Sequence, residues 1–234
     1  MKIVFTDLNK VHGGAPVMIQ DALDFQSRLL QDIADDPRSD HHIFYAEHTP
    51  VYTVVKNKTG PLFRSTERPV DVRIPLVEVL RSGSITYHGP GQLVYYLVLN
   101  MDMFPIKSGV MGQCIDEIVI EALDQFNISA HHKPEHLPAN ASGVWITEDD
   151  GKQKKIASRG IDIKKYGKTS ISRFGFALNV STDLSYFDFI YPCGLDIEMT
   201  SMKEVLGKAP PLQKVARCIN AIIRTKFEQK EKAS

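Results

Sequence analysis

Residues 81–92 read Arg-Ser-Gly-Ser-Ile-Thr-Tyr-His-Gly-Pro-Gly-Gln and lie between two apolar runs typical of strands. Three glycines, one proline and one histidine fall within this stretch. Because glycine lacks a Cβ and proline fixes φ, such a chain can bend sharply and lie close to another group. The stretch, which we call the cradle, therefore predicts a ligand-binding loop.

A thiol stands in a second short motif, Tyr-Pro-Cys-Gly at residues 191–194. A lone cysteine is most often a small buried hydrophobe, and we interpret Cys114 and Cys218 as packing residues because each falls in a helical pattern. Cys193 differs because it stands between a proline and a glycine. We expect this turn to expose the sulfur, which makes Cys193 a candidate nucleophile.

A lysine stands where a polar turn gives way to an apolar segment. Lys152 and Lys154 have the pattern of a solvated turn, whereas Lys155 is followed at once by Ile156 and Ala157. The chain is therefore expected to enter the core at Lys155. An ammonium group beside a thiol favours the thiolate, so Lys155 is a candidate partner for a nucleophilic cysteine.

Taken in order, these motifs resemble those of the lipoyl(octanoyl) transferase family. The run Thr-Tyr-His-Gly-Pro-Gly-Gln within the cradle is highly specific, and the matches cover roughly residues 45–205. The matching segments are residues 47–53, 81–92, 143–145, 155–160, 177–180 and 191–194. The resemblance implies one α+β domain over residues 1–234, with a mixed β-sheet, packed helices and the fold shared by biotin and lipoate ligases.

The resemblance also implies an activity: transfer of an octanoyl group from octanoyl-acyl carrier protein, through a cysteine thioester, to a lysine of a lipoyl domain. The acceptors would be lipoyl domains of 2-oxoacid dehydrogenases and the glycine cleavage H protein, and the product would feed lipoate biosynthesis. Cys193 and Lys155 would be catalytic, and no cofactor is expected. The residues implied to bind substrate are Arg81, Ser82, Gly83, Ser84, Ile85, Thr86, Tyr87, His88, Ser158, Arg159, Gly160, Gly175, Phe176 and Ala177.

The chain departs from the family pattern at several positions. Ser82 replaces a cradle glycine, and Tyr191 replaces the asparagine before Pro-Cys. Where the family has Phe-His-Gly, residues 173–175 read Arg-Phe-Gly, so a pocket histidine is replaced by Phe174. The chain is also longer than the usual member between Gly160 and Gly175. These changes bear on the fit of the acyl chain and on proton handling, not on the nucleophile.

Composition restricts the class of protein. Formal net charge is zero and 43% of the 234 residues are hydrophobic, so a sizeable core is available and no basic patch suggests nucleic acid. No apolar run approaches the ~20 residues of a membrane span. Three widely spaced cysteines argue against a disulfide framework and for a reducing compartment such as the cytoplasm.

Periodicity predicts the secondary structure. We expect strands at 1–7, 43–46, 51–55, 77–80, 93–100, 144–146, 160–163 and 174–180, and helices at 21–33, 115–126 and 215–227. We expect loops at 35–41 and 56–68, a polar turn at 148–154, a helix stop at Asn127 and a frayed tail at 228–234. Strands and helices do not alternate strictly, which favours an α+β fold.

Other functions remain open from the residues alone. His41, His42 and His48, or His131, His132 and His136, could be metal ligands, but their spacing matches no closed zinc pattern, so no metal site is expected. An ATP-dependent lipoate or biotin ligase would not need a thiol at position 193, and the cradle lacks the Walker pattern. A silent module that binds acyl carrier or lipoyl domains would need neither Lys155 nor Cys193.

Overall fold

The computed structural model describes residues 2–56, 62–64 and 74–231, with side chains as far as Phe227. The main sheet of this part of the chain is mixed: β1 and β2 pair in parallel, and every other neighbouring pair is antiparallel. Its order is β1 (Ile3–Asp7), β2 (His41–Ala46), β6 (Gln92–Val98), β12 (Gly175–Asn179), β9 (Gln153–Arg159), β8 (Gly143–Thr147) and β7 (His131–His132).

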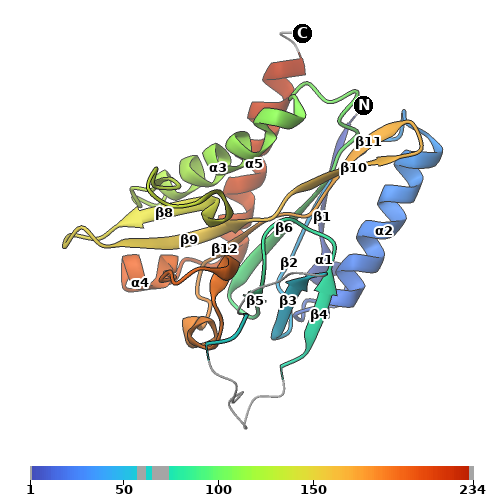
Figure 1. Ribbon diagram of the computed structural model, residues 1–234. Helices are drawn as coiled ribbons and strands as arrows, with labels where there is room; N and C mark the ends of the chain where they lie inside the picture. Colours follow the sequence, from blue (N-terminus) through green and yellow to red (C-terminus); the bar gives the residue numbers. More distant parts are fainter. Residues whose placement is uncertain (1, 57–61, 65–73, 232–234) are drawn as a thin grey trace.

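Helices cover both faces of this sheet (Figure 1). On β6, Tyr95 and Leu97 face the core shared with α3 (Ser108–Asp124) and α5 (Leu212–Glu231), while Tyr96 and Val98 face α2 (Ile19–Asp35). Side chains alternate between the faces of a strand, so a continuous apolar run such as that of β6 fits a strand that is covered on both sides.

A smaller sheet carries the cradle. Its order is β4 (Leu76–Val79), β3 (Val51–Val55) and β5 (Thr86–His88), and it has its own core that includes Tyr52, Ile85 and Phe187. A separate hairpin, β10 (Asp162–Tyr166) and β11 (Thr169–Arg173), occupies the region where the chain exceeds the usual family length. The remaining short elements are α1 (Leu8–Val11), α4 (Met202–Leu206) and the 3₁₀ turns η1 (Ala139–Ala141), η2 (Leu184–Phe189) and η3 (Pro192–Gly194).

The predicted α+β class with a mixed sheet is confirmed. Two local predictions were wrong. The middle of the cradle forms strand β5, because residues 86–88 pair with β3. Residues 153–159 form strand β9, with the predicted turn confined to the residues before it. Helix α5 extends to Glu231, and the frayed tail predicted at 228–234 stays a prediction.

Two further predictions concern the ends of elements. Asn127 has a left-handed φ of 57° just after α3, as a helix stop requires. The loop predicted at 56–68 lies mostly outside the described residues, as does the tail beyond Glu231. Within the described part of the chain, no helix combines the length and apolarity needed to cross a membrane.

Candidate active site

Cys193 occupies a strained turn. Its φ and ψ are 60° and 13°, a left-handed conformation that is uncommon for a residue with a side chain. Its N–H donates to the Ile85 carbonyl oxygen at 3.1 Å, and the Gly194 N–H donates to the Tyr191 carbonyl oxygen at 2.7 Å. The turn is thereby tied to the cradle. The expectation of an exposed sulfur was wrong: Cys193 is only 8% exposed, because it lines an internal pocket.

The ammonium group of Lys155 meets this thiol. Lys155 Nζ donates to Cys193 Sγ over 3.4 Å, and the lysine is fully buried. No carboxylate within the described residues forms a salt bridge with it, and its Nζ lies 5.8 Å from the centre of the Trp145 ring. A buried cation is costly unless it is paired. The sulfur of Cys193 is the hydrogen-bond partner that the structure gives this ammonium group.

Backbone pairing fixes the distance between the two residues. The Lys155 N–H donates to the Glu198 carbonyl oxygen, and the Thr200 N–H donates to the Lys155 carbonyl oxygen, both over 2.9 Å. Met199, in the segment after Cys193, thus forms an isolated parallel bridge with Lys155 of β9. Lys155 and the segment after the Cys193 turn are held in register by main-chain bonds, which do not depend on flexible side chains.

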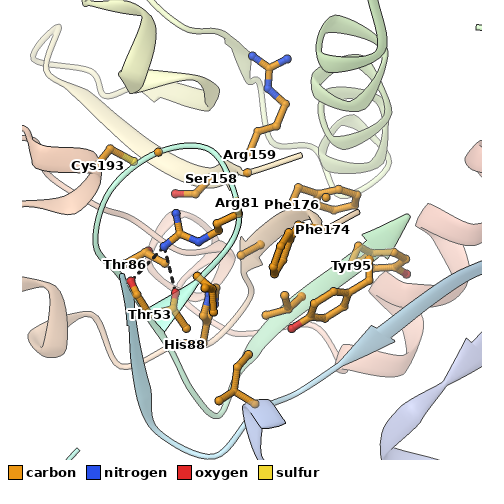
Figure 2. Close-up of a pocket in the computed structure, with 18 residues that line it drawn as sticks. Thr53, Arg81, Thr86, His88, Tyr95, Ser158, Arg159, Phe174, Phe176 and Cys193 are labelled. Carbon is orange, nitrogen blue, oxygen red and sulfur yellow. Dashed lines mark hydrogen bonds between the residues drawn. The ribbon is translucent and has the colours of Figure 1, made fainter. Parts of the chain in front are cut away.

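A pocket of about 570 Å³, counting its open mouth, extends from Cys193 between the cradle and the main sheet. Figure 2 shows polar groups near the thiol, including Arg81, Ser158 and Thr86, and aromatic rings farther away. The apolar walls are formed by Ile19, Val79, Val94, Tyr95, Tyr96, Phe174, Phe176 and Ala177. A ligand with a reactive polar end and an apolar tail fits this division.

Arg81 places a second cation at the polar end. Its guanidinium donates to the carbonyl and hydroxyl oxygens of Thr53 at 3.1 and 3.0 Å, and to the Ser82 carbonyl oxygen at 2.9 Å. Each of these acceptors is neutral. Burial lowers the pKa of Arg81 to about 10, and the charge of Cys193 opposes this shift. Arg81 therefore remains cationic at neutral pH and makes this end of the pocket suited to an anion.

His88 lies on the pocket wall in its neutral form. Burial, assisted by neighbouring His48, lowers its pKa to about 3. Its Nδ1 donates to Gln92 Oε1 over 2.6 Å, and the Gln92 amide in turn donates to Asn179 Oδ1 over 2.9 Å. Asn179 then donates to the Thr200 carbonyl oxygen over 3.0 Å. This chain of bonds connects the cradle to the segment that pairs with Lys155, so His88 is placed to position groups rather than to take up a proton.

Most predicted binding residues meet in this pocket. Those that line it are Arg81, Gly83, Thr86, His88, Ser158, Arg159, Gly160, Gly175, Phe176 and Ala177. The structure does not bring the other four to its walls. Ser82 is exposed and donates to the Ile161 carbonyl oxygen, and Ser84 lies next to Gly194. Ile85 is in the core of the smaller sheet, and Tyr87 stacks on Tyr186.

One glycine is required by close approach. A Cβ on Gly175 would lie 2.5 Å from the Tyr95 carbonyl oxygen, so any side chain there would separate β12 from β6. This contact explains why a glycine is needed at this point of the predicted site.

Several residues of the site escaped sequence reasoning. Ile19, Thr53, Val79, Val94 and Phe174 line the pocket. Tyr95 and Tyr96 contribute rings to the pocket while their hydroxyls bond elsewhere, to Ala216 and His48. Asn140 donates to the Cys193 carbonyl oxygen. The change of a family histidine to Phe174 was the one available indication among these residues.

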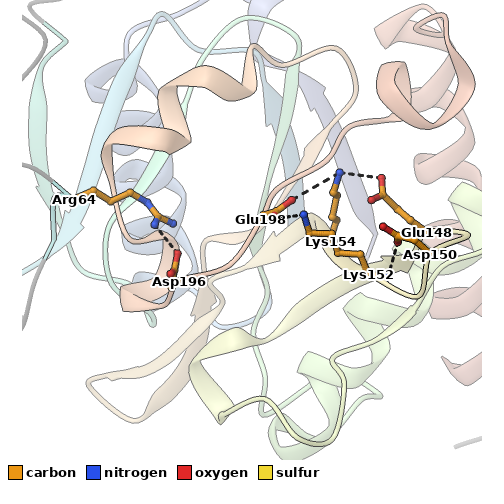
Figure 3. Close-up of polar contacts among 7 residues, drawn as sticks. All are labelled: Arg64, Glu148, Asp150, Lys152, Lys154, Asp196 and Glu198. Carbon is orange, nitrogen blue, oxygen red and sulfur yellow. Dashed lines mark hydrogen bonds and ion pairs between the residues drawn. The ribbon is translucent and has the colours of Figure 1, made fainter.

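Surface charges fasten the segment that follows Cys193 (Figure 3). Arg64 pairs with Asp196, donates to the Ile190 carbonyl oxygen over 2.8 Å, and lies 4.8 Å from the Tyr191 ring centre. At the other end, Glu198 pairs with Lys152 and Lys154 of the β8–β9 hairpin. Exposed ion pairs contribute ~0–1 kcal/mol each. The bond of Arg64 to the Ile190 carbonyl oxygen and its contact with the Tyr191 ring therefore contribute more to holding this segment in place.

Sequence comparison identifies the class. A family model described as the lipoyl protein ligase A/B catalytic domain matches residues 18–224. The chain belongs to this family. The octanoyltransferase of Dictyoglomus thermophilum is 33% identical, covering 91% of this chain and 85% of the relative. That of Bacteroides fragilis (strain YCH46) is also 33% identical, covering 75% and 76%. Within the family, these relatives bear the name octanoyltransferase.

Solved structures agree in fold. A bi-partite lipoate protein ligase from Thermoplasma acidophilum has a TM-score of 0.65 and 13% identity, over 97% of this chain and 83% of that chain. Lipoate-protein ligase A bound with ATP has a TM-score of 0.63 and 15% identity, over 97% and 84%. At this identity the likeness concerns the fold, which is the lipoate ligase fold predicted from the motifs.

Proposed function

We propose that the chain is an octanoyltransferase of lipoate biosynthesis that works through an acyl-thioester on Cys193. The observation that carries this proposal is the 3.4 Å contact between Lys155 Nζ and Cys193 Sγ at the polar end of an apolar pocket. The octanoyltransferase relatives support the choice of acyl group.

The first half-reaction loads the enzyme. The thiolate of Cys193 attacks the thioester carbonyl of octanoyl-acyl carrier protein; a bond forms between Sγ and the carbonyl carbon, and the carrier leaves as its thiol after taking one proton. The donor thioester carries the energy that an ATP-using ligase would otherwise supply, so the reaction proceeds without a cofactor.

The second half-reaction regenerates the enzyme. A lysine amine of a lipoyl domain, from a 2-oxoacid dehydrogenase or the glycine cleavage H protein, attacks the acyl-thioester. An amide forms, the bond to Sγ breaks, and the proton lost by the amine returns to the thiol. Lys155 is placed to stabilise the thiolate and relay this proton. His88 is a poor candidate for this step because the lowered pKa makes it a weak base.

Both half-reactions pass through an oxyanion that hydrogen-bond donors must stabilise. The Gly194 N–H, which is next to the thiol in sequence, already donates to the Tyr191 carbonyl oxygen, so it would have to give up a 2.7 Å bond to serve. The Arg81 guanidinium lines the pocket near the thiol, and none of its hydrogen bonds within the described residues is to a carboxylate. We assign the stabilisation of the negative charge that develops on the carbonyl oxygen to cationic hydrogen-bond donors at this end of the pocket.

Intact mass spectrometry tests the proposal. After incubation with octanoyl-acyl carrier protein, wild-type protein should carry one octanoyl group, mapped to Cys193, that a lipoyl domain removes. Cys193→Ser should carry no thioester, while Cys114→Ser and Cys218→Ser should load normally. Loading that requires ATP and free octanoate or lipoate would indicate a ligase, and binding of carrier without an adduct would indicate a silent module. Either result would overturn the proposal.

The cysteines fit the same setting. Cys114, Cys193 and Cys218 form no disulfide in the described structure. A thiol nucleophile needs a reducing compartment, and we place the protein in the cytoplasm, as one catalytic domain over residues 1–234.

A further inference from the structure

Phe174 has a backbone conformation that a bulky side chain rarely adopts. Within the described residues, Asn127, Phe174 and Cys193 are the non-glycine positions with positive φ, and that of Phe174 is 56°. Asn127 ends a helix and Cys193 forms the nucleophile turn. Strained residues are concentrated at functional sites. Phe174 lines the same pocket as Cys193, which makes it a candidate for a role in the site.

Both polar groups of the Phe174 backbone are held. Its N–H donates to Gln26 Oε1 over 2.7 Å, and its carbonyl oxygen accepts from the Leu97 N–H over 3.0 Å. Gln26 is 4% exposed and stands on the buried face of α2, where apolar residues are the rule. A buried amide on this face is explained by the bond that it makes to Phe174.

This anchoring sets where the ring lies. In Figure 2 the Phe174 ring stands on the side of the pocket away from Cys193, with Ser158 and Arg81 between them. The ring belongs to the apolar cluster with Val79, Val94 and Tyr96, and it is 8% exposed. It therefore forms part of the apolar wall that an acyl tail would meet if its carbonyl lay at the thiol.

We propose that the Phe174 ring is the stop that sets the length of the linear saturated acyl chain accepted at Cys193, with Gln26 as its positioning residue. The inference rests on the proposed acyl-thioester function. A chain with more methylenes than the pocket holds must displace the ring. Its backbone is held on both sides, so the ring can move aside only by rotating about its own side-chain bonds against the cluster in which it is packed.

The test measures acylation of Cys193 by octanoyl, decanoyl, dodecanoyl and tetradecanoyl thioesters of acyl carrier protein, by intact mass spectrometry. Phe174→Gly suits a positive φ and removes the ring, so it should shift the preference toward longer chains. A misfit of one methylene in an apolar pocket changes selection ~10–200-fold, and we expect the decanoyl-to-octanoyl rate ratio to rise by at least about ten-fold.

Three variants separate the ring from its surroundings. Phe174→Leu keeps an apolar but shorter side chain and should give a smaller shift in the same direction. Gln26→Met removes the bond to the Phe174 N–H and should broaden the length profile with the ring still present. Asn127→Gly relieves a positive φ far from the pocket and should leave the profile unchanged.

The outcomes distinguish two failures. If no thioester of any length acylates wild-type protein, the proposed function fails. If wild-type protein is acylated but folded Phe174→Leu and Gln26→Met keep its length profile, the pocket is closed by another residue and this inference is wrong, whether or not Phe174→Gly folds.

Discussion

The side-chain amide of Asn140 donates a hydrogen bond of 2.9 Å to the backbone carbonyl oxygen of Cys193. That carbonyl belongs to a residue in the left-handed region, a conformation that costs roughly 1–3 kcal/mol without glycine. The bond from Asn140 holds the carbonyl group of Cys193, and the bond to the Ile85 carbonyl oxygen holds its N–H group, so the strained residue is fixed on both sides.

Replacing Asn140 with alanine should therefore loosen the nucleophile. We expect Asn140→Ala to lose ~0.5–1.5 kcal/mol of unfolding free energy, the usual contribution of one hydrogen bond, and to lower the rate of Cys193 acylation. Urea unfolding and the loading assay measure the two effects. Asn127→Ala is the control. Asn127 also has a left-handed backbone but does not line the pocket, so this variant should load at the normal rate. Normal loading by folded Asn140→Ala would show that the Cys193 turn keeps its conformation without the bond from Asn140.

Lys155→Met should remove the cation beside the thiol while keeping an unbranched buried side chain. We expect loading and transfer to fall ~10²–10⁴-fold, as for other general acid–base groups, and alkylation of Cys193 at neutral pH to slow in parallel. Lys154→Met is the matched control: it is the adjacent residue on β9, its ion pairs are with Glu148 and Glu198, and its activity should be nearly unchanged. Equal activities of the two variants would contradict the assignment.

Arg64→Met should release the segment around Cys193 from its outer anchor. The bond to the Ile190 carbonyl oxygen, the pair with Asp196 and the contact with the Tyr191 ring are all lost. Amide hydrogen exchange should become faster at residues 190–196 and the loading rate should fall. Arg224→Met is the control. It removes from α5 a cation that lies 4.3 Å from the centre of the Phe5 ring, and it should leave the exchange at residues 190–196 and the loading rate unchanged. Unaltered hydrogen exchange in Arg64→Met would mean that the ion pairs of Glu198 and the backbone bonds are enough to hold residues 190–196 in place.

Two buried histidines predict acid sensitivity. Burial lowers the pKa of His48 to about 4 and that of His88 to about 3. Both are neutral in the folded protein at pH 5, whereas the unfolded chain takes up protons near pH 6.5. Between these values the unfolded state binds more protons, so their contribution to stability is fully present above pH 6.5 and is lost as pH falls toward 4.

The measurement is the unfolding free energy in urea at pH 7 and pH 5. Wild-type protein should be less stable at pH 5. His48→Gln should show a smaller difference between the two pH values, even if it is less stable at both. His12→Gln, at an exposed position, should behave as wild type. A His48→Gln difference as large as that of wild type would place the acid sensitivity elsewhere.

Sequence patterns predicted the elements whose residues are buried in a regular repeat. Strand β3 was predicted with its observed bounds, and α2 and α5 within a few residues. Strand β5 was missed because three residues among glycines carry no periodicity. Strand β9 was misplaced because Gln153 and Lys154 are only partly buried and resemble a turn, although Lys155 between them and the core is fully buried.

The site was predictable where the chemistry is local and not where it depends on packing. The thiol, the amine and the cradle could be identified from short motifs. The far wall of the pocket could not, because Ile19, Val79 and Phe174 meet only after α2, β4 and the start of β12 have packed together. The burial of Cys193 was unpredictable for the same reason: the cover comes from the cradle, more than a hundred positions earlier in the chain.

The strand order has a consequence for how the protein matures. Central strand β6 lies between β2 and β12, so Tyr96 pairs with Gly175, and β9 joins only through β12. Contacts between residues so distant along the chain close large loops and slow folding. The Cys193 turn is bonded to Ile85, more than a hundred positions earlier, so the thiol and the ammonium group take their observed places only when such long-range contacts have formed. A chain still being synthesised, which has not made these contacts, is therefore expected to lack the assembled pair.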